Sequence, residues 1–227
     1  MAINYLGASQ IYTGGTSDYT FESPVDVIKG QTLIIFITAA DIGLSPTKPS
    51  DWTEIQRIES GNGTLYGYWH QATGDTIRPT WTITGLSNKF NAGFCIFLDN
   101  CSKNPNKIIN NSDARVDISF GPVPLPFSTT VKNTAIIQCV SIVGNPSVYV
   151  VSNSWSSDPT LIWTESRKGL KQSGVYSIYH SSAISLPVPT DDYETSYVLN
   201  QLSQNLVINV AVSPLKTNQV QNLIRSF

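Results

Sequence analysis

Short strand-like segments, each ended by turn-forming residues, follow one another along almost the whole chain. Apolar and polar residues alternate within them with a period of two, which is typical of β-strands because successive side chains point to opposite faces of a sheet. Gly, Pro, Asn and Asp separate the segments, as at 60–63 and 144–146, and favour tight turns there. No stretch before the last residues shows the 3.6-residue period of a helix. The sequence therefore predicts an all-β protein.

The segment 64–70 indicates how such strands would pack. One face of this strand would carry Leu65, Gly67 and Trp69, and the other would carry Thr64, Tyr66, Tyr68 and His70. Two distinct faces are what the packing of one sheet on another requires. We therefore predict a two-layer β-sandwich, or jelly-roll-like, architecture with polar outer faces.

The composition excludes several classes of protein. Charged residues are 13% of the chain, about half the usual share, and 27 Ser, 21 Thr and 17 Asn take their place. Hydrophobicity is too high and net charge, at −2, too low for a disordered chain. The longest apolar run, at 33–37, is far shorter than a bilayer-spanning helix. A pI of about 5.6 without a basic patch gives no support for a nucleic-acid partner.

Four sequence blocks recur in the same order in two parts of the chain. The segment 31–40 resembles 133–142, for example, and 65–70 resembles 175–180. We infer two pseudo-repeated halves, at about 30–100 and 132–212. Two arrangements remain open: the halves interleave into one large sandwich, which we favour, or each half forms a small sandwich.

The repeat suggests a division of the chain into three parts. Residues 1–29 are expected to form N-terminal strands or an arm, 30–212 the sandwich body, and 213–227 a C-terminal tail. The Pro-rich stretch 121–127 would cross from one half to the other as a stiff, extended connector.

The two histidines, His70 and His180, occupy equivalent positions in the repeated blocks. A catalytic histidine needs an orienting carboxylate and a nucleophile within reach, and no sequence motif supplies either. Each histidine ends a strand-like run of alternating aromatics, so we interpret both as structural residues. We expect no enzymatic activity and no catalytic residues.

Metal and cofactor sites are not indicated either. Asp191 and Asp192 form the densest acidic cluster, and we interpret them as part of a solvated loop rather than a calcium loop. Cys95 and Cys139 lie in apolar runs and should behave as small buried hydrophobic residues, and with Cys101 they lack the spacing of a zinc site. We expect no disulfide, no bound metal and no cofactor.

Four apolar residues are candidate partner contacts. Trp155, flanked by Ser and Asn, is the most loop-like of the five tryptophans, the other four lying in strand-like segments. Leu223, Ile224 and Phe227 belong to the tail, outside the repeated blocks. We expect the tail, either a short helix or an extended arm, to dock on a neighbouring subunit, although folding back on its own sandwich is an equal alternative.

Several segments together resemble a β-sandwich module of tailed-bacteriophage virion proteins. That module has a hydrophobic strand, a P-S-G-W-T turn, a Y-W strand followed by A-T, a strand of alternating Thr and aromatic residues, and a later T-T-x-x-N-A segment. The matching residues here are 30–40, 49–55, 68–73, 79–84 and 127–137. This chain departs from the pattern at Asp51, where the module usually has Gly.

The resemblance implies a non-enzymatic virion structural protein, made in the host cytoplasm and located in the virion. It would be a capsid decoration protein, a head fibre or a tail appendage that binds a repeated protein lattice. We expect a homo-oligomer with phage capsid or tail proteins as partners, and no nucleic-acid or membrane partner. The alternative is a carbohydrate- or receptor-binding fibre module that contacts a glycan. A glycan-degrading enzyme is a third, less favoured reading.

Overall fold

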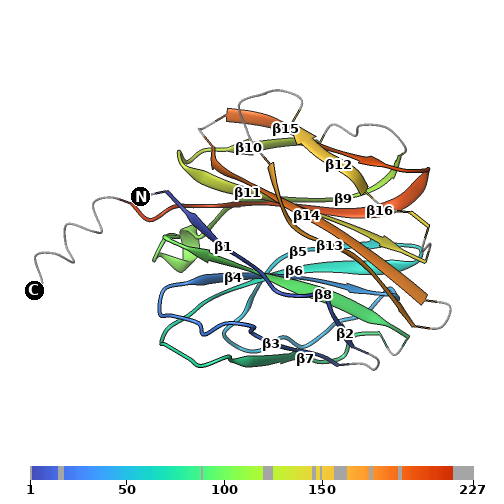
Figure 1. The fold of residues 1–227 in the computed structure, drawn as a ribbon, viewed down its shortest axis with the longest axis horizontal. Coiled ribbons are helices and arrows are strands. Elements are labelled where there is room, and N and C mark those ends of the chain that lie inside the picture. The colour runs from blue at the N-terminus through green and yellow to red at the C-terminus, as the bar shows by residue number, and fades with distance from the viewer. Residues whose placement is uncertain are drawn as a thin grey trace, which may run out of the picture.

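In the computed structural model the chain folds into β-strands stacked in four layers (Figure 1). The structure describes residues 2–14, 18–87, 89–119, 125–144, 147–148, 150–155, 163–173, 176–188 and 191–216, some of the later strand residues by their backbone only. All strand pairs in this part are antiparallel, and its one helical element is a 3-10 turn, η1 (Pro105–Lys107). The predicted all-β sandwich class is confirmed.

The N-terminal half of the chain forms two of the four layers. The inner N-terminal sheet has the order β1-β8-β4-β6-β5, with β2 also paired to β8. Its strands are β1 (Asn4–Ala8), β2 (Tyr12–Gly14), β4 (Thr32–Ala39), β5 (Thr53–Ser60), β6 (Gly63–Gln71) and β8 (Asn91–Asp99). The outer N-terminal sheet consists of β3 (Tyr19–Glu22) and β7 (Thr80–Ile83).

The C-terminal half forms the other two layers. The inner C-terminal sheet has the order β13-β14-β11-β16-β9, and the outer C-terminal sheet has the order β10-β15-β12. The inner strands are β9 (Ile109–Ser119), β11 (Thr134–Val143), β13 (Trp163–Ser173), β14 (Tyr176–Val188) and β16 (Ser203–Val212). The outer strands are β10 (Leu125–Thr129), β12 (Val150–Trp155) and β15 (Asp191–Leu199).

The two inner sheets share one strand order. The series β8-β4-β6-β5 corresponds to β16-β11-β14-β13, β1 flanks β8 as β9 flanks β16, and the pair β3-β7 corresponds to β10-β15. No sheet in the described part mixes strands of the two halves, so the favoured interleaved sandwich is wrong. Each half builds its own inner and outer sheet, and within each inner sheet most neighbouring strands are not consecutive in sequence.

The boundary between the halves also differs from the prediction. Strand β9 pairs with β16 along its length, so the C-terminal half begins at Ile109, after η1. The Pro-rich stretch 121–127 therefore follows β9 within this half, with residues 125–127 already in β10, and does not connect the halves. Residues 120–124 are outside the described part.

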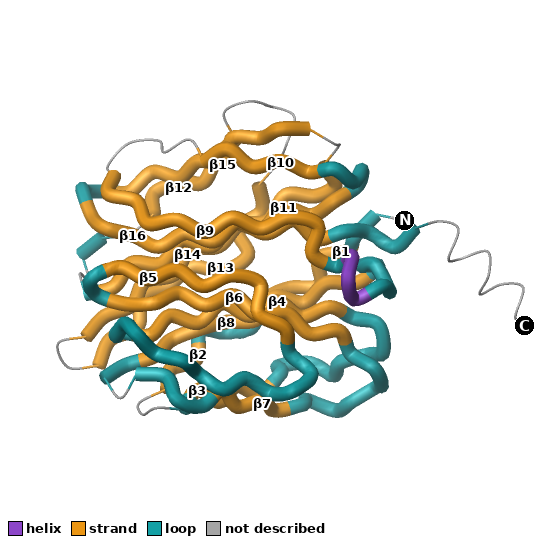
Figure 2. The backbone as a smooth tube through the Cα atoms, turned by 180° about the vertical axis from the view of Figure 1, so that it is seen from behind, coloured by secondary structure: helices purple, strands orange, loops and turns teal. Residues whose placement is uncertain are grey.

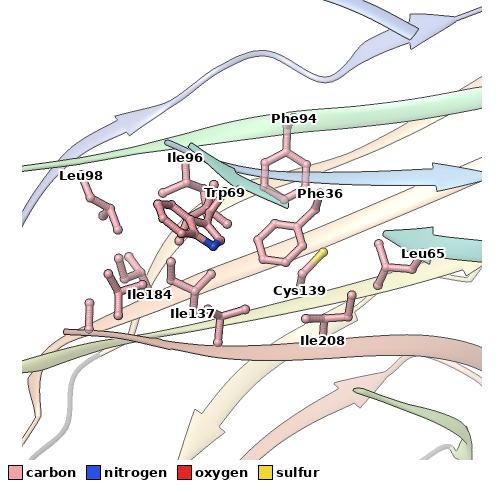
Figure 3. Packing of buried hydrophobic residues seen from close by; sticks show 14 of the residues in the cluster. Phe36, Leu65, Trp69, Phe94, Ile96, Leu98, Ile137, Cys139, Ile184 and Ile208 are labelled. Atoms are coloured by element: carbon pink, nitrogen blue, oxygen red, sulfur yellow. The ribbon is translucent and has the colours of Figure 1, made fainter. Parts of the chain in front are cut away.

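The main core lies between the two inner sheets (Figure 3). Its largest members are rings from the N-terminal half, and aliphatic side chains of β11, β14 and β16 pack against them. The set shown includes Phe36, Leu65, Trp69, Phe94, Ile96, Leu98, Ile137, Cys139, Ile184 and Ile208. Full burial of one such side chain contributes about 1.5–3 kcal/mol, so this layer provides a large part of the folding free energy.

Two further clusters lie under the outer sheets. Tyr66 and Tyr68 of β6 pack in a cluster with Phe21 of the outer N-terminal sheet, whereas Leu65 and Trp69 belong to the main core. The predicted division of β6 into two faces is therefore confirmed. Both faces are covered, however, so the two-layer expectation is replaced by four layers.

Polar contacts also join the halves. Thr38 of β4 and Ser141 of β11 lie in the interior with their hydroxyl oxygens 2.7 Å apart. At the edge of the stack, Gln56 of β5 donates to the Ser112 hydroxyl of β9 over 3.0 Å. Figure 2 shows β5 and β9 next to one another, where the edges of the two inner sheets meet.

We predict that Gly93→Ala destabilises the protein by about 2 kcal/mol, within the range for overpacking a core. A Cβ at Gly93 would lie 2.6 Å from the Phe36 carbonyl oxygen, which β4 cannot move without breaking its pairing with β8. The matched control is Gly61→Ala, since a Cβ there meets no atom within 4 Å. Urea unfolding measures both, and an equal effect of the two substitutions would contradict the close approach of β4 and β8.

Candidate functional site

His70 lies near the end of β6, on the face of the inner N-terminal sheet toward β3 and β7. Its Nδ1 is 3.1 Å from the Asp51 carbonyl oxygen and 3.3 Å from Oδ2 of the same residue. Both are acceptors, so Nδ1 carries a proton. The ring stacks on Trp52 at 5.3 Å and tilts against Trp81 at 5.9 Å.

His180 lies in a different environment, between the two inner sheets. Its Nε2 donates to the Ala92 carbonyl oxygen over 3.1 Å, and the ring meets Phe94 edge-on. Its Nδ1 is buried without a hydrogen-bond partner in the described structure. Burial lowers the pKa of His180 from 6.5 to about 4, and the bond to Ala92 opposes this shift only in part. The ring is therefore a neutral core residue.

The predicted equivalence of the two histidines is wrong. His70 pairs with Leu33 at the start of β4, whereas His180 pairs with Ser141 near the end of β11. The repeat alignment also matches Ile35 with Ile137, although Ile35 faces the outer sheet and Ile137 faces the partner sheet. A shift of one residue moves a side chain to the other face of a strand, which sequence similarity alone does not detect.

Two predicted loop residues lie in strands. Trp155 is the last residue of β12 and pairs with Thr195, and the start of β15 places Asp191 opposite Thr129. Their side chains are outside the described part, as are Leu223, Ile224 and Phe227 altogether. The backbone at both positions is part of a strand, so their interpretation as loop residues is wrong. Strand pairing satisfies their backbone groups despite the polar neighbours.

The remaining tryptophans divide between core and rim. Trp52 and Trp69 are buried, Trp81 is partly exposed, and the side chain of Trp163 is outside the described part. Trp69, in β6, belongs to the main core. Trp81 lies in β7, within the two-stranded outer sheet itself, and this position leaves it partly exposed.

The predicted burial of Cys95 and Cys139 is confirmed. Cys95, Cys101 and Cys139 are all buried and free. Burial raises the pKa of each thiol, to about 12 for Cys101, so the thiols stay protonated and unreactive at neutral pH. The described residues contain no group of three or more side chains suited to a metal ion.

The described start of the predicted tail belongs to the body. Pro214 forms a β-bridge with Cys101, and the Leu215 amide donates to the Asn100 carbonyl over 2.7 Å. Leu215 is also nearly buried. The chain therefore runs along the body at least as far as this residue.

A recess with acidic, imidazole, hydroxyl and aromatic side chains lies around His70. It encloses about 210 Å³ and is lined by Val27, Asp51, His70, Ala72, Thr73, Gly74, Thr76, Pro79 and Trp81. The Asp51 side chain is half exposed there, at 52%, and the turn that carries it is closed by a bond from the Trp52 amide to the Pro49 carbonyl. Asp51 is not among the described residues with positive φ, so its turn does not require the usual Gly.

Sequence analysis did not identify Asp51 and Trp81 as site residues. Both lie in segments that were interpreted as framework, and they are 30 positions apart. Only the pairing of β7 with β3, across the face of β6, brings them to one recess.

No protein-family model matches the chain, and neither the curated proteins nor the solved structures include a significant match. Among the described residues, no helix has the length and hydrophobicity to cross a bilayer.

We predict that His180 makes stability depend on pH. Above pH 6.5 neither the folded nor the unfolded chain binds a proton there. Between pH 6.5 and about 4 only the unfolded chain binds this proton. The free energy of unfolding therefore decreases as the pH is lowered through this window, by about 3 kcal/mol in all. Below pH 4 this contribution changes no further.

His180→Gln removes this titration and keeps a donor for the Ala92 carbonyl. Urea unfolding at several pH values gives the free energy of unfolding of both chains. The value for the wild type minus the value for the variant should decrease as the pH is lowered from 6.5 to about 4. A difference that stays constant would show that the ring is accessible to protons in the folded chain.

Proposed function

We propose that this chain is a non-enzymatic structural protein of a tailed-phage virion that binds a repeated protein lattice, as a capsid decoration protein or a head-fibre or tail appendage. The resemblance behind this proposal rests on framework segments. The matching residues include strand β4, the turn before β5, the end of β6 and strand β7. These elements build one half of the stack, and the other half repeats its strand order.

The observation that best supports attachment is the position of the two chain ends. Asn4 of β1 pairs with Asp99, and Leu215 hydrogen-bonds to Asn100, so both ends of the described chain lie at one end of the body (Figure 1). We call this the terminal end. The β5–β6 hairpin, around Gly61, lies at the opposite end of the strands. A partner bound at the terminal end would leave the opposite end free.

Attachment should depend on shape and hydrogen bonds more than on charge. The described part contains three ion pairs of acidic with basic side chains, and the chain as a whole has a net charge of −2. Each pair neutralises its own charges at the surface. We therefore expect the affinity for the lattice to change little with salt concentration.

The copy number per particle tests this proposal. Quantitative mass spectrometry of purified particles should detect the chain in a fixed ratio to the major capsid protein. Hundreds of copies would identify a decoration protein, and up to a few dozen would identify a fibre or appendage. Absence of the chain from particles would overturn the proposal.

We predict that the apolar residues of the tail contact the lattice. Leu223→Asp, Ile224→Asp and Phe227→Asp, combined in one variant, should abolish co-sedimentation with particles that lack the chain and leave the melting temperature unchanged. The matched control replaces the polar residues Asn218, Gln219 and Gln221 with Ala and should still bind.

A truncation series separates docking from folding. Removal of 217–227 should act like the Asp variant, whereas removal from 214 should also lower the melting temperature, because Leu215 is part of the body. A large loss of stability on removal of 217–227 alone would show that the tail folds on its own subunit.

A further inference from the structure

We propose that the recess around His70 binds one pyranose unit of a glycan, with Trp81 as the stacking surface and Asp51 as the main hydrogen-bond acceptor. This inference does not depend on lattice binding. It replaces Trp155, the tryptophan that the sequence favoured for a surface contact, with a site whose side chains are described.

Trp81 offers a rigid aromatic surface. Its ring stacks on Phe21 with centroids 5.2 Å apart and meets Trp52 edge-on at 5.5 Å, while part of it stays exposed at the recess. These contacts hold the indole in one orientation, so little side-chain entropy is lost when a ligand stacks on it. The C–H face of a pyranose ring is a suitable partner for such a surface.

Asp51 supplies an oriented acceptor beside the ring, and His70 helps to hold it in place. The imidazole engages Oδ2 of Asp51, which leaves Oδ1 of the half-exposed carboxylate available to sugar hydroxyl groups. Hydrogen bonds to a carboxylate are the stronger ones in proteins, and here the acceptor is held in place before the ligand arrives. Thr73 and Thr76 add hydroxyl groups to the lining.

The size of the recess suits a single sugar ring with space for the next. Its volume of about 210 Å³ is below the range of sites for larger ligands. An adjoining hollow of about 500 Å³ shares Ala72 and Thr73 with it and continues toward Lys29 and Lys103. A glycan chain could therefore extend beyond the bound unit without meeting the body.

A quaternary ammonium ion is the main competing ligand, since it also binds an indole face beside a carboxylate. Such an ion has no hydrogen-bond donors. It would therefore cover the imidazole and the threonine hydroxyls of this recess without pairing them, which is unfavourable. The hydroxyl groups of a sugar hydrogen-bond to these groups, and the face of its ring stacks on the indole.

Saturation-transfer NMR of the full chain tests this inference, with a panel of methyl pyranosides and with tetramethylammonium as probes. We expect at least one pyranoside to bind in the millimolar range, with the strongest transfer from the hydrogens of one ring face. Asp51→Asn should weaken that binding about tenfold or more. Asp41→Asn, a partly exposed carboxylate that pairs with Lys89 at the opposite end, is the matched control and should bind as the wild type does.

Trp81→Ala should abolish binding. Because this substitution also removes packing against Phe21, the melting temperature of the variant must be measured as well. Asp51→Asn retains the backbone bond between His70 and the Asp51 carbonyl and is the variant that decides. Binding of tetramethylammonium alone, no binding of any probe, or pyranoside binding that Asp51→Asn leaves intact would each overturn the proposal.

A failure of the glycan proposal can be distinguished from a failure of the lattice proposal. Asp51→Asn should co-sediment with particles like the wild type, and the tail variant with three Asp substitutions should retain pyranoside binding.

Discussion

Burial of both faces of the two inner sheets is the constraint on which the rest of the structure depends. Phe36 of β4 packs into the core between the halves, and its neighbours Ile35 and Ile37 pack beneath the outer sheet. A strand buried on both faces must be apolar throughout, which is why β4 and β8 consist largely of consecutive hydrophobic residues. The outer sheets are then required, because without them one full face of each inner sheet would be exposed to water.

A core of this kind specifies little about how the two halves align, since apolar contacts are not directional. The polar contacts inside it supply that information. The hydroxyl groups of Thr38 and Ser141 pair across the sheets, and His180 reaches the Ala92 carbonyl of the opposite half. Displacement of one sheet along the other would leave these buried groups unpaired, at a cost of about 1–3 kcal/mol each. The few polar residues of the core therefore favour one alignment of the halves.

The same stacking explains where binding surfaces arise. The outer N-terminal sheet has only two short strands, so Trp81 stays partly exposed beside the buried ring of His70. Both ends of the described chain lie at the terminal end. The proposed glycan recess and the proposed lattice attachment would thus use neighbouring but separate surfaces, each of which can be altered by substitution without disturbing the main core.

The β class, the burial of Cys95 and Cys139 and the two faces of β6 follow from the sequence, because local alternation determines which side of a strand a residue occupies. Alternation does not determine which sheet covers that side, nor the register between strands. The four layers, the place of β9 in the C-terminal half and the separation of His70 from His180 therefore came only from the tertiary structure. The recess depends on it most, since the pairing of β5 with β6 brings Asp51 to His70, and only the packing of β3 and β7 on β6 adds Trp81.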